Sequence, residues 1–254
     1  MANVLSNKLE TLALELEESK ELAKAKERLL LIHIDEMEIL YGKLNEQVEE
    51  LNRKNKQLRE SFLRTIESLA ISVEAKDYYT NGHSKRVAYY CKIMASEMGL
   101  STQEKEELEL AGLVHDIGKI GISEKVLQKP SKLSDEEYNH IKEHPLVGAK
   151  ILQPLEGVNN IICWIKHHHE RFDGRGYPSG LTGDQIPLGA KIIACADTYD
   201  AMTTDRPYRE ALAPEHALEE IKKSCGSQLD PEIGLTFFKL GIYGKLNVEK
   251  RIMD

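Results

Sequence analysis

The chain has 254 residues, of which 41% are hydrophobic and 30% are charged. This composition is typical of a folded protein, and the length allows one good-sized domain with an extension or two small domains. The net charge of -8 argues against binding to a nucleic-acid polymer, which usually requires a basic face. No apolar run could cross a bilayer, no signal-peptide pattern opens the chain, and the four cysteines are widely spaced. We therefore expect a cytoplasmic protein with reduced thiols and no membrane association.

Residues 1–70 contain no proline and a single glycine, and they are rich in Glu, Lys and Leu. Within them, a series of positions is separated alternately by four and three residues, and all but one are apolar: Leu30, Ile34, Met37, Tyr41, Leu44, Val48, Leu51, Asn55, Leu58 and Phe62. Such a heptad seam predicts a long helix that forms a parallel coiled coil with a second copy of the chain, and Asn55 would fix its register. The alternative is a long helix that folds back on its own domain.

Residues 71–254 lack the alternating pattern of strands and carry repeated signals for the start of a helix. These signals are capping boxes, in which serine is followed three residues later by glutamate, and prolines in a first turn: Ser101, Ser134, Pro214 and Pro231. The predicted fold is therefore all-α, with one long irregular loop at 170–188. Loops of this length in compact domains are often functional.

Eight of the nine histidines follow residue 80, and several lie beside carboxylates. The groups are His83, His115 with Asp116, His144, His168 and His169 with Glu170, and Asp197. Imidazoles combined with carboxylates, and no paired thiolates, suit a hydrolytic Fe, Mn or Zn site better than a structural zinc site. Each group alone is a weak signal, but together they predict a metal centre.

Four segments in this order resemble the motifs of the HD-GYP family, a branch of the HD phosphohydrolases, and the resemblance covers about 75–240. They are Tyr79-Thr-Asn-Gly-His-Ser-Lys-Arg-Val87, Leu113-Val-His-Asp-Ile-Gly-Lys119, His168-His-Glu-Arg-Phe-Asp-Gly-Arg-Gly-Tyr-Pro178, and the block from Ala196 to Arg209. The resemblance implies an HD-type helical bundle with a long GYP loop and a centre of two divalent metal ions. Iron or manganese is the expected metal, and zinc is compatible with the same ligands.

The resemblance also implies the ligand sets. One ion would be held by His83, His115 and Asp197, and the other by His144, His168 and His169, with Asp116 bridging the two. Two adjacent cations can acidify a bridging water and clamp the phosphoryl oxygens during in-line attack. Second-shell carboxylates usually orient such imidazoles, and three candidates remain unranked: Glu170, Asp173 and Asp200.

Further roles follow from the same resemblance. Lys119 resembles the catalytic lysine, and Arg206 and Arg209 match positions that hold the phosphates of the ligand. Tyr177 would approach a guanine base or only shape the cleft. Some relatives have a glutamate that helps hold a third metal where this chain has Tyr79, which favours a two-metal centre.

The activity that the resemblance implies is a metal-dependent phosphodiesterase that opens cyclic di-GMP to linear pGpG, and the sequence leaves open whether hydrolysis stops there or continues to GMP. One alternative is a binding module that senses the nucleotide and docks a partner protein through the GYP loop. Another is an HD phosphohydrolase for a different nucleotide, such as cyclic GMP-AMP, a mononucleotide or an alarmone. The complete set of implied metal ligands favours the enzyme. We found no recognisable sensor domain, so we expect the coiled coil or a signalling partner to carry the regulating signal.

Overall fold

The structure is a computed structural model, and it describes residues 2–76, 82–129, 131–205 and 210–246. Within these residues every regular element is a helix, and the only β-type pairings are two isolated bridges, Asp173–Thr182 and Cys225–Leu229. The predicted all-α class is confirmed. Among the same residues, no helix combines the length and the apolar character needed to cross a membrane.

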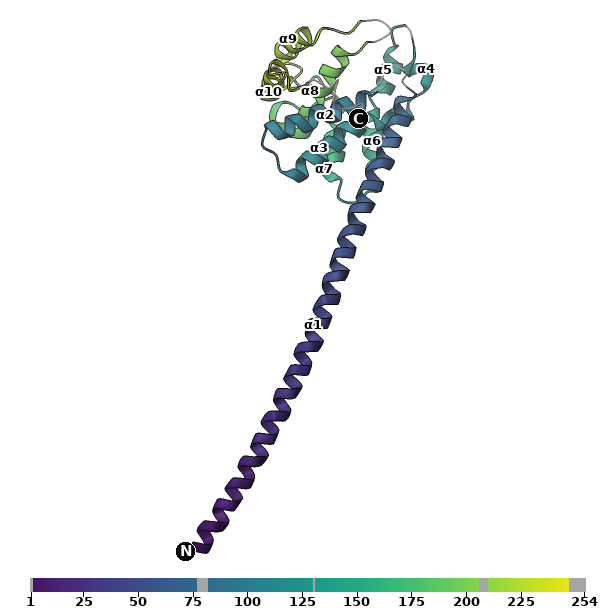
Figure 1. Ribbon diagram of the computed structural model, residues 1–254. Helices are drawn as coiled ribbons and strands as arrows, with labels where there is room; N and C mark the ends of the chain where they lie inside the picture. The colour runs from purple at the N-terminus through teal and green to yellow at the C-terminus, as the bar shows by residue number, and fades with distance from the viewer. Residues whose placement is uncertain (1, 77–81, 130, 206–209, 247–254) are drawn as a thin grey trace. The chain divides into compact units, whose positions relative to one another are not determined.

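The first element is one long helix, α1 (Ala2–Glu74) (Figure 1). Its surface carries ion pairs one turn apart, such as Lys24 with Glu21 and Lys54 with Glu50, which support a helix in water. The chain divides into two compact units, 1–62 and 63–254, and α1 spans the division. The boundary that we predicted between residues 70 and 71 stays a prediction.

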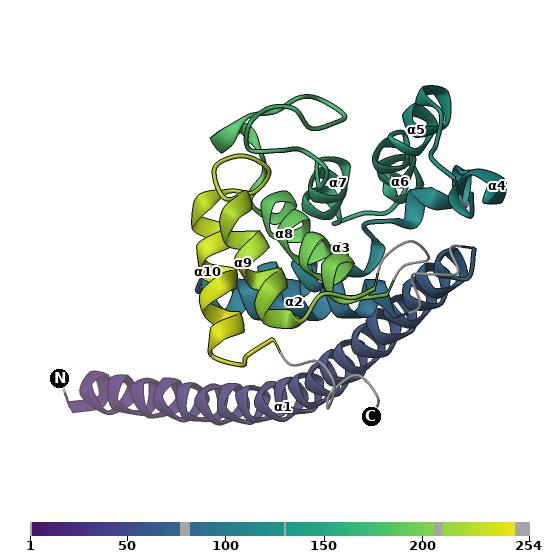
Figure 2. The ribbon, with the colours of Figure 1, turned by 90° about the horizontal axis from the view of Figure 1, so that it is seen from above.

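The second unit is a bundle of short helices (Figure 2). In chain order these are α2 (His83–Glu97), α3 (Thr102–Val114), the 3-10 turn η1 (Ile117–Gly121), α4 (Glu124–Leu127), α5 (Asp135–Ile141), α6 (His144–Leu152), α7 (Asn159–Lys166), the 3-10 turn η2 (Gly183–Gln185), α8 (Leu188–Thr203), α9 (Pro214–Ser224) and α10 (Pro231–Ile242). Helix α2 packs on α3, α8 and α10, while α6 packs on η1 and α7. The core between them includes Val87, Met94, Leu108, Ile192 and Phe237, all fully buried.

The helix starts follow the signals in the sequence. Ser101 and Ser134 each accept a hydrogen bond from the backbone N–H of the glutamate three residues later, which completes both predicted capping boxes. Pro214 and Pro231 occupy first turns, and Asp230 caps α10. These caps fix where each helix begins, and therefore which side chains project from the ends of the helices.

Candidate metal centre

The predicted histidines and carboxylates gather into two adjacent groups. One contains His83, His115 and Asp197, and the other contains Asp116, His144, His168 and His169. Within each group the possible ligand atoms all lie within 4.8 Å of one another. The seven residues are the ones that the family resemblance implies as metal ligands, although the first and the last of them, His83 and Asp197, are more than one hundred residues apart in the sequence.

The residues meet because helix ends converge on one place. His83 is the first residue of α2, and His144 is the first residue of α6. His115 and Asp116 follow directly after the last residue of α3, while Asp197 lies within α8. His168 and His169 follow the end of α7. The bundle thus holds short polar segments together at its interior.

In four of the five imidazoles the Nδ1 atom is engaged by a fixed acceptor. The acceptors are a backbone carbonyl for His115, His144 and His168, at 2.7, 2.8 and 2.6 Å, and the Asp200 carboxylate for His83, at 2.7 Å. Donation from Nδ1 leaves the lone pair on Nε2. The fold therefore selects the tautomer that ligates through Nε2.

These Nε2 atoms face one another. His83 Nε2 lies 3.3 Å from His115 Nε2 and 3.4 Å from Asp197 Oδ1, and His144 Nε2 lies 3.4 Å from His168 Nε2. Two nitrogen lone pairs at this distance repel unless a cation or a proton lies between them. The donor set therefore fits divalent metal ions that accept imidazole and carboxylate ligands.

Asp116 links the two groups. Its Oδ1 lies 3.2 Å from His144 Nε2, while its Oδ2 lies 3.5 Å from His115 Nε2 and 2.6 Å from Lys119 Nζ. Burial alone would raise the pKa of Asp116, but the Lys119 ammonium and the neighbouring imidazoles outweigh it and hold that pKa well below its usual range. Asp116 is thus an anion that faces both groups, as a bridging ligand must be.

Burial lowers the pKa of two imidazoles of the second group, His168 and His169. It lowers the pKa of His168 well below the ordinary value, and it lowers the pKa of His169 to about 3, with the neighbouring histidines adding to both effects. A metal ion binds only an imidazole nitrogen that carries no proton. Because the pKa values of His168 and His169 are low, protons compete only weakly with a metal ion for these side chains. His83 differs: burial lowers its pKa, but Asp200 and Asp197 more than compensate and raise it.

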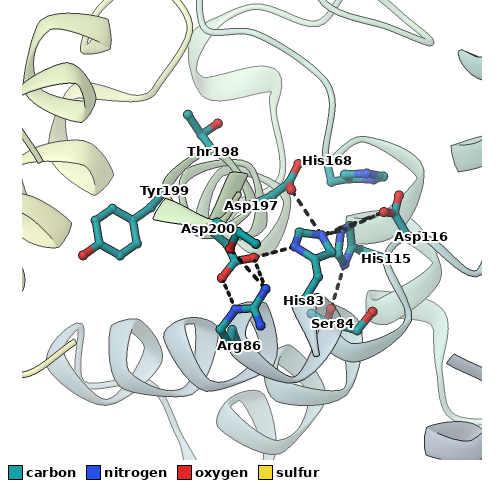
Figure 3. A network of polar contacts seen from close by, with 12 residues as sticks. His83, Ser84, Arg86, His115, Asp116, His168, Asp197, Thr198, Tyr199 and Asp200 are labelled. Carbon is teal, nitrogen blue, oxygen red and sulfur yellow. Dashed lines mark hydrogen bonds and ion pairs between the residues drawn. The ribbon is translucent and has the colours of Figure 1, made fainter. Parts of the chain in front are cut away.

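The structure ranks the three candidate orienting carboxylates. Asp200 is buried and accepts from His83, and it also pairs with Arg86 Nε at 2.6 Å and Nη2 at 3.0 Å. Figure 3 shows His83 between Asp200 on one side and His115 with Asp116 on the other. Sequence reasoning missed Arg86, although its position one helical turn after His83 places both on one face of α2.

The other two carboxylates organise the GYP loop. Glu170 is buried and accepts from the backbone N–H groups of Ser179 and Leu181, at 2.7 and 3.1 Å. Asp173 pairs with Arg171 and accepts from the backbone N–H of Arg175. Among the residues that the structure describes, neither Glu170 nor Asp173 forms a hydrogen bond with an imidazole of the centre. These two carboxylates therefore shape the loop.

Lys119 and Tyr177 both lie at the centre. Gly118, between Asp116 and Lys119, packs so closely on the backbone of His144 that a Cβ would collide with it. This contact brings the Asp116–Lys119 segment against α6. The Tyr177 ring lies 4.9 Å from the His169 ring, centroid to centroid. The predicted phosphate contacts Arg206 and Arg209, and Tyr79, lie outside the described residues.

The histidines that matched no motif stay apart from both groups. His167 is engaged with the Cys163 carbonyl of its own helix, and His140 lies 3.4 Å from Glu143. His33 and His216 belong to neither group. The two groups of imidazoles and carboxylates, with an adjacent lysine, form a donor set that suits divalent metal ions inside a helical bundle.

Comparison with known proteins agrees with such a metal centre. The family model described as "HD domain" matches residues 67–233, so the chain belongs to the HD domain family. The resemblance to the HD-GYP branch is confirmed by the relatives. One, from Thermotoga maritima, is named a cyclic di-GMP phosphodiesterase and is 38% identical over 200 residues, which cover 77% of this chain and 52% of the relative.

Two further relatives carry more specific names. The 3'3'-cGAMP-specific phosphodiesterase 3 of Vibrio cholerae is 39% identical over 63% of this chain and 35% of its own length. The cyclic di-GMP phosphodiesterase response regulator RpfG of Xanthomonas campestris is 38% identical over 69% of this chain and 47% of its own. The chain therefore spans about a third to a half of the length of these relatives.

The fold also matches a solved structure. The crystal structure of a cyclic GMP-AMP-specific phosphodiesterase from V. cholerae aligns with a TM-score of 0.59 at 18% identity, covering 72% of this chain and 49% of that one. At this identity the match supports the fold alone.

Proposed function

We propose that the chain is a metal-dependent phosphodiesterase that hydrolyses a cyclic dinucleotide, with cyclic di-GMP as the expected substrate. The observation that carries the proposal is the pair of adjacent imidazole–carboxylate groups, with the Asp116 carboxylate 3.2 Å from His144 Nε2, 3.5 Å from His115 Nε2 and 2.6 Å from Lys119 Nζ. The relatives named as phosphodiesterases of cyclic dinucleotides support the substrate class.

The residues of the site would have three kinds of role: metal binding, charge stabilisation and substrate binding. One divalent ion would be held by His83, His115 and Asp197, and the other by His144, His168 and His169. Asp116 would be a ligand of both ions. Iron or manganese is the expected metal, and zinc is compatible with the same ligands. When bound, such a pair activates water and neutralises charge on the phosphoryl oxygens. Lys119 would stabilise the charge that develops on the leaving ribose oxygen. Tyr177 would contact a base beside His169, and Arg206 and Arg209 would hold the phosphates.

A product assay tests this function. Protein purified without oxygen is loaded with manganese or iron and incubated with cyclic di-GMP, and the products are separated by chromatography. Linear pGpG is the expected product, and the same separation shows whether hydrolysis continues to GMP. Binding of cyclic di-GMP without any product in metal-loaded protein would instead support the binding module.

Cyclic GMP-AMP is a second candidate substrate. Its support is the 39% identity to a V. cholerae phosphodiesterase specific for 3'3'-cGAMP. The same assay run with both cyclic dinucleotides, compared by kcat/KM, decides between the two.

We also propose that α1 forms a parallel, two-stranded coiled coil with α1 of a second copy. The apolar seam side chains from Leu30 to Leu58 are exposed in the single chain; for example, Leu44 is 55% and Leu51 is 59% exposed, whereas Phe62 is half-buried. One helix cannot bury such a stripe against itself, and a second identical stripe would cover it. The signalling partners that this helix would serve stay a prediction.

Replacing Leu44 by aspartate is expected to shift the full chain from dimer to monomer at micromolar concentration. The charge would lie inside the seam, where its desolvation is costly. The mass in solution is measured by light scattering. The matched control is Ile39→Asp, since Ile39 is similarly exposed, at 60%, but lies outside the seam. A wild-type chain that is monomeric, or two variants that behave alike, would contradict the coiled coil.

A further inference from the structure

We propose that Glu74, the last residue of α1, is a positioning residue for His83, and that it strengthens metal binding at the centre by holding the first turn of α2. The inference rests on the proposed metal centre and adds a residue that the family motifs quoted above do not include.

Glu74 forms two direct hydrogen bonds with the backbone at the start of α2. Glu74 Oε1 accepts a hydrogen bond from the backbone N–H of Ser84 at 2.6 Å, and Glu74 Oε2 accepts one from the backbone N–H of Gly82 at 3.1 Å. These two N–H groups flank His83. One carboxylate from α1 therefore clamps the backbone on both sides of a candidate ligand.

The first turn of α2 lacks a cap of its own. Its N-cap residue is Gly82, which has φ of 72° and no side chain to accept a hydrogen bond, and the first turn contains no acidic residue. The N–H groups at the start of a helix otherwise have no partner, and the helix dipole favours a negative charge there. Glu74 supplies both the acceptor and the charge from another helix.

The end of α1 belongs to the second unit and packs within it. Ile66, Ala70 and Val73 are buried along one face of its last turns. Just beyond, Lys76 Nζ donates to the Ile120 carbonyl at 3.0 Å, and Gln128 Nε2 donates to the Lys76 carbonyl at 3.0 Å. Ile120 belongs to η1, which follows Asp116. Glu74 thus stands on a segment that is anchored next to the other half of the centre.

The position of His83 is then set from two directions. Asp200 holds its ring through Nδ1, and Glu74 holds its backbone (Figure 3 shows the ring contact). Metal–ligand distances are tolerant to only about 0.2 Å, so a small shift of this turn would move Nε2 away from a productive position. Because Glu74 belongs to α1, the helix that carries the predicted seam has a physical link to a metal ligand.

The test is the metal affinity of Glu74→Gln, which keeps the shape of the side chain and removes its charge. Manganese binding to the metal-free chain is measured by competition with a chelator of known affinity. Loss of an outer contact that orients a ligand typically weakens metal binding by 10–100-fold. Because Glu74 acts through the backbone, we expect the lower end, about 10-fold weaker binding of one of the two ions. Hydrolysis should recover when manganese is raised to saturation.

The matched control is Glu67→Gln. Glu67 also joins α1 to the first turn of α2, through an ion pair with Lys85 at 2.7 Å, but this contact is to a side chain and not to the backbone N–H groups that flank His83. Its loss should leave the metal affinity unchanged. Glu74→Asp, which keeps the charge on a shorter side chain, should fall between wild type and Glu74→Gln, and circular dichroism of the metal-free proteins establishes that each variant is folded.

The outcomes separate this inference from the proposed function. If wild-type protein binds no metal, the proposed centre is wrong. If wild-type protein binds two ions and Glu74→Gln binds both with unchanged affinity, the centre stands and the role of Glu74 is refuted. A loss of thermal stability alone, with unchanged metal affinity, would also refute it, because Glu74 would then only stabilise the fold.

Discussion

Asp116→Asn is expected to abolish hydrolysis and to reduce the metal content of the chain at both positions. The substitution keeps the shape of the side chain but removes the anion that faces both groups of imidazoles. A metal cluster of neutral imidazoles depends on its carboxylates for charge balance. The remaining single carboxylate, Asp197, lies in only one of the two groups.

The number of metal ions per chain is measured by elemental mass spectrometry. Turnover of cyclic di-GMP is measured in the same samples. The matched control is Asp184→Asn, because the Asp184 side chain is fully exposed and belongs to neither group of the centre. Normal metal content together with normal turnover in Asp116→Asn would show that Asp116 is not a shared ligand.

Lys119→Ala is expected to lower kcat by about 100- to 1000-fold, the cost of removing one group that stabilises charge in a transition state. KM should change little, because the charge on the leaving oxygen develops only during the reaction. The Lys119 side chain is largely buried and paired with Asp116, so its loss also removes one of the groups that hold the pKa of Asp116 low.

Steady-state kinetics on metal-saturated protein separate these effects. Lys125→Ala is the matched control, since Lys125 is an exposed lysine six residues later on α4. A rise in KM with unchanged kcat in Lys119→Ala would reassign this lysine to substrate binding. Loss of metal at saturating concentration would instead make it a support for Asp116.

The sequence predicted residue types better than it predicted contacts. Helix starts such as Ser101 and Ser134 depend on interactions three residues apart, so a local pattern is sufficient to locate them. The seven candidate ligands could be named from the family resemblance. Their grouping in space was implied only by resemblance, because no local rule brings residue 83 close to residue 197.

The residues that support the ligands were harder to predict. Asp200 was one of three unranked carboxylates, and its partner Arg86 was not considered. Glu74 lies just beyond the predicted coiled coil of residues 1–70 and before the first of the quoted motifs, and nothing in the local sequence distinguishes it from other helical glutamates. Its role depends on a turn of α2 that has no cap of its own, which becomes evident only when the two helix ends are placed together.

Titration of the metal-free chain with manganese, with bound metal and hydrolysis of cyclic di-GMP measured in the same samples, tests the central claim most directly. If Asp116 joins two ions in one centre, activity should stay near background while one ion per chain is bound and should rise as the second binds. Full activity at one ion per chain, or in metal-free protein, would contradict the two-metal centre.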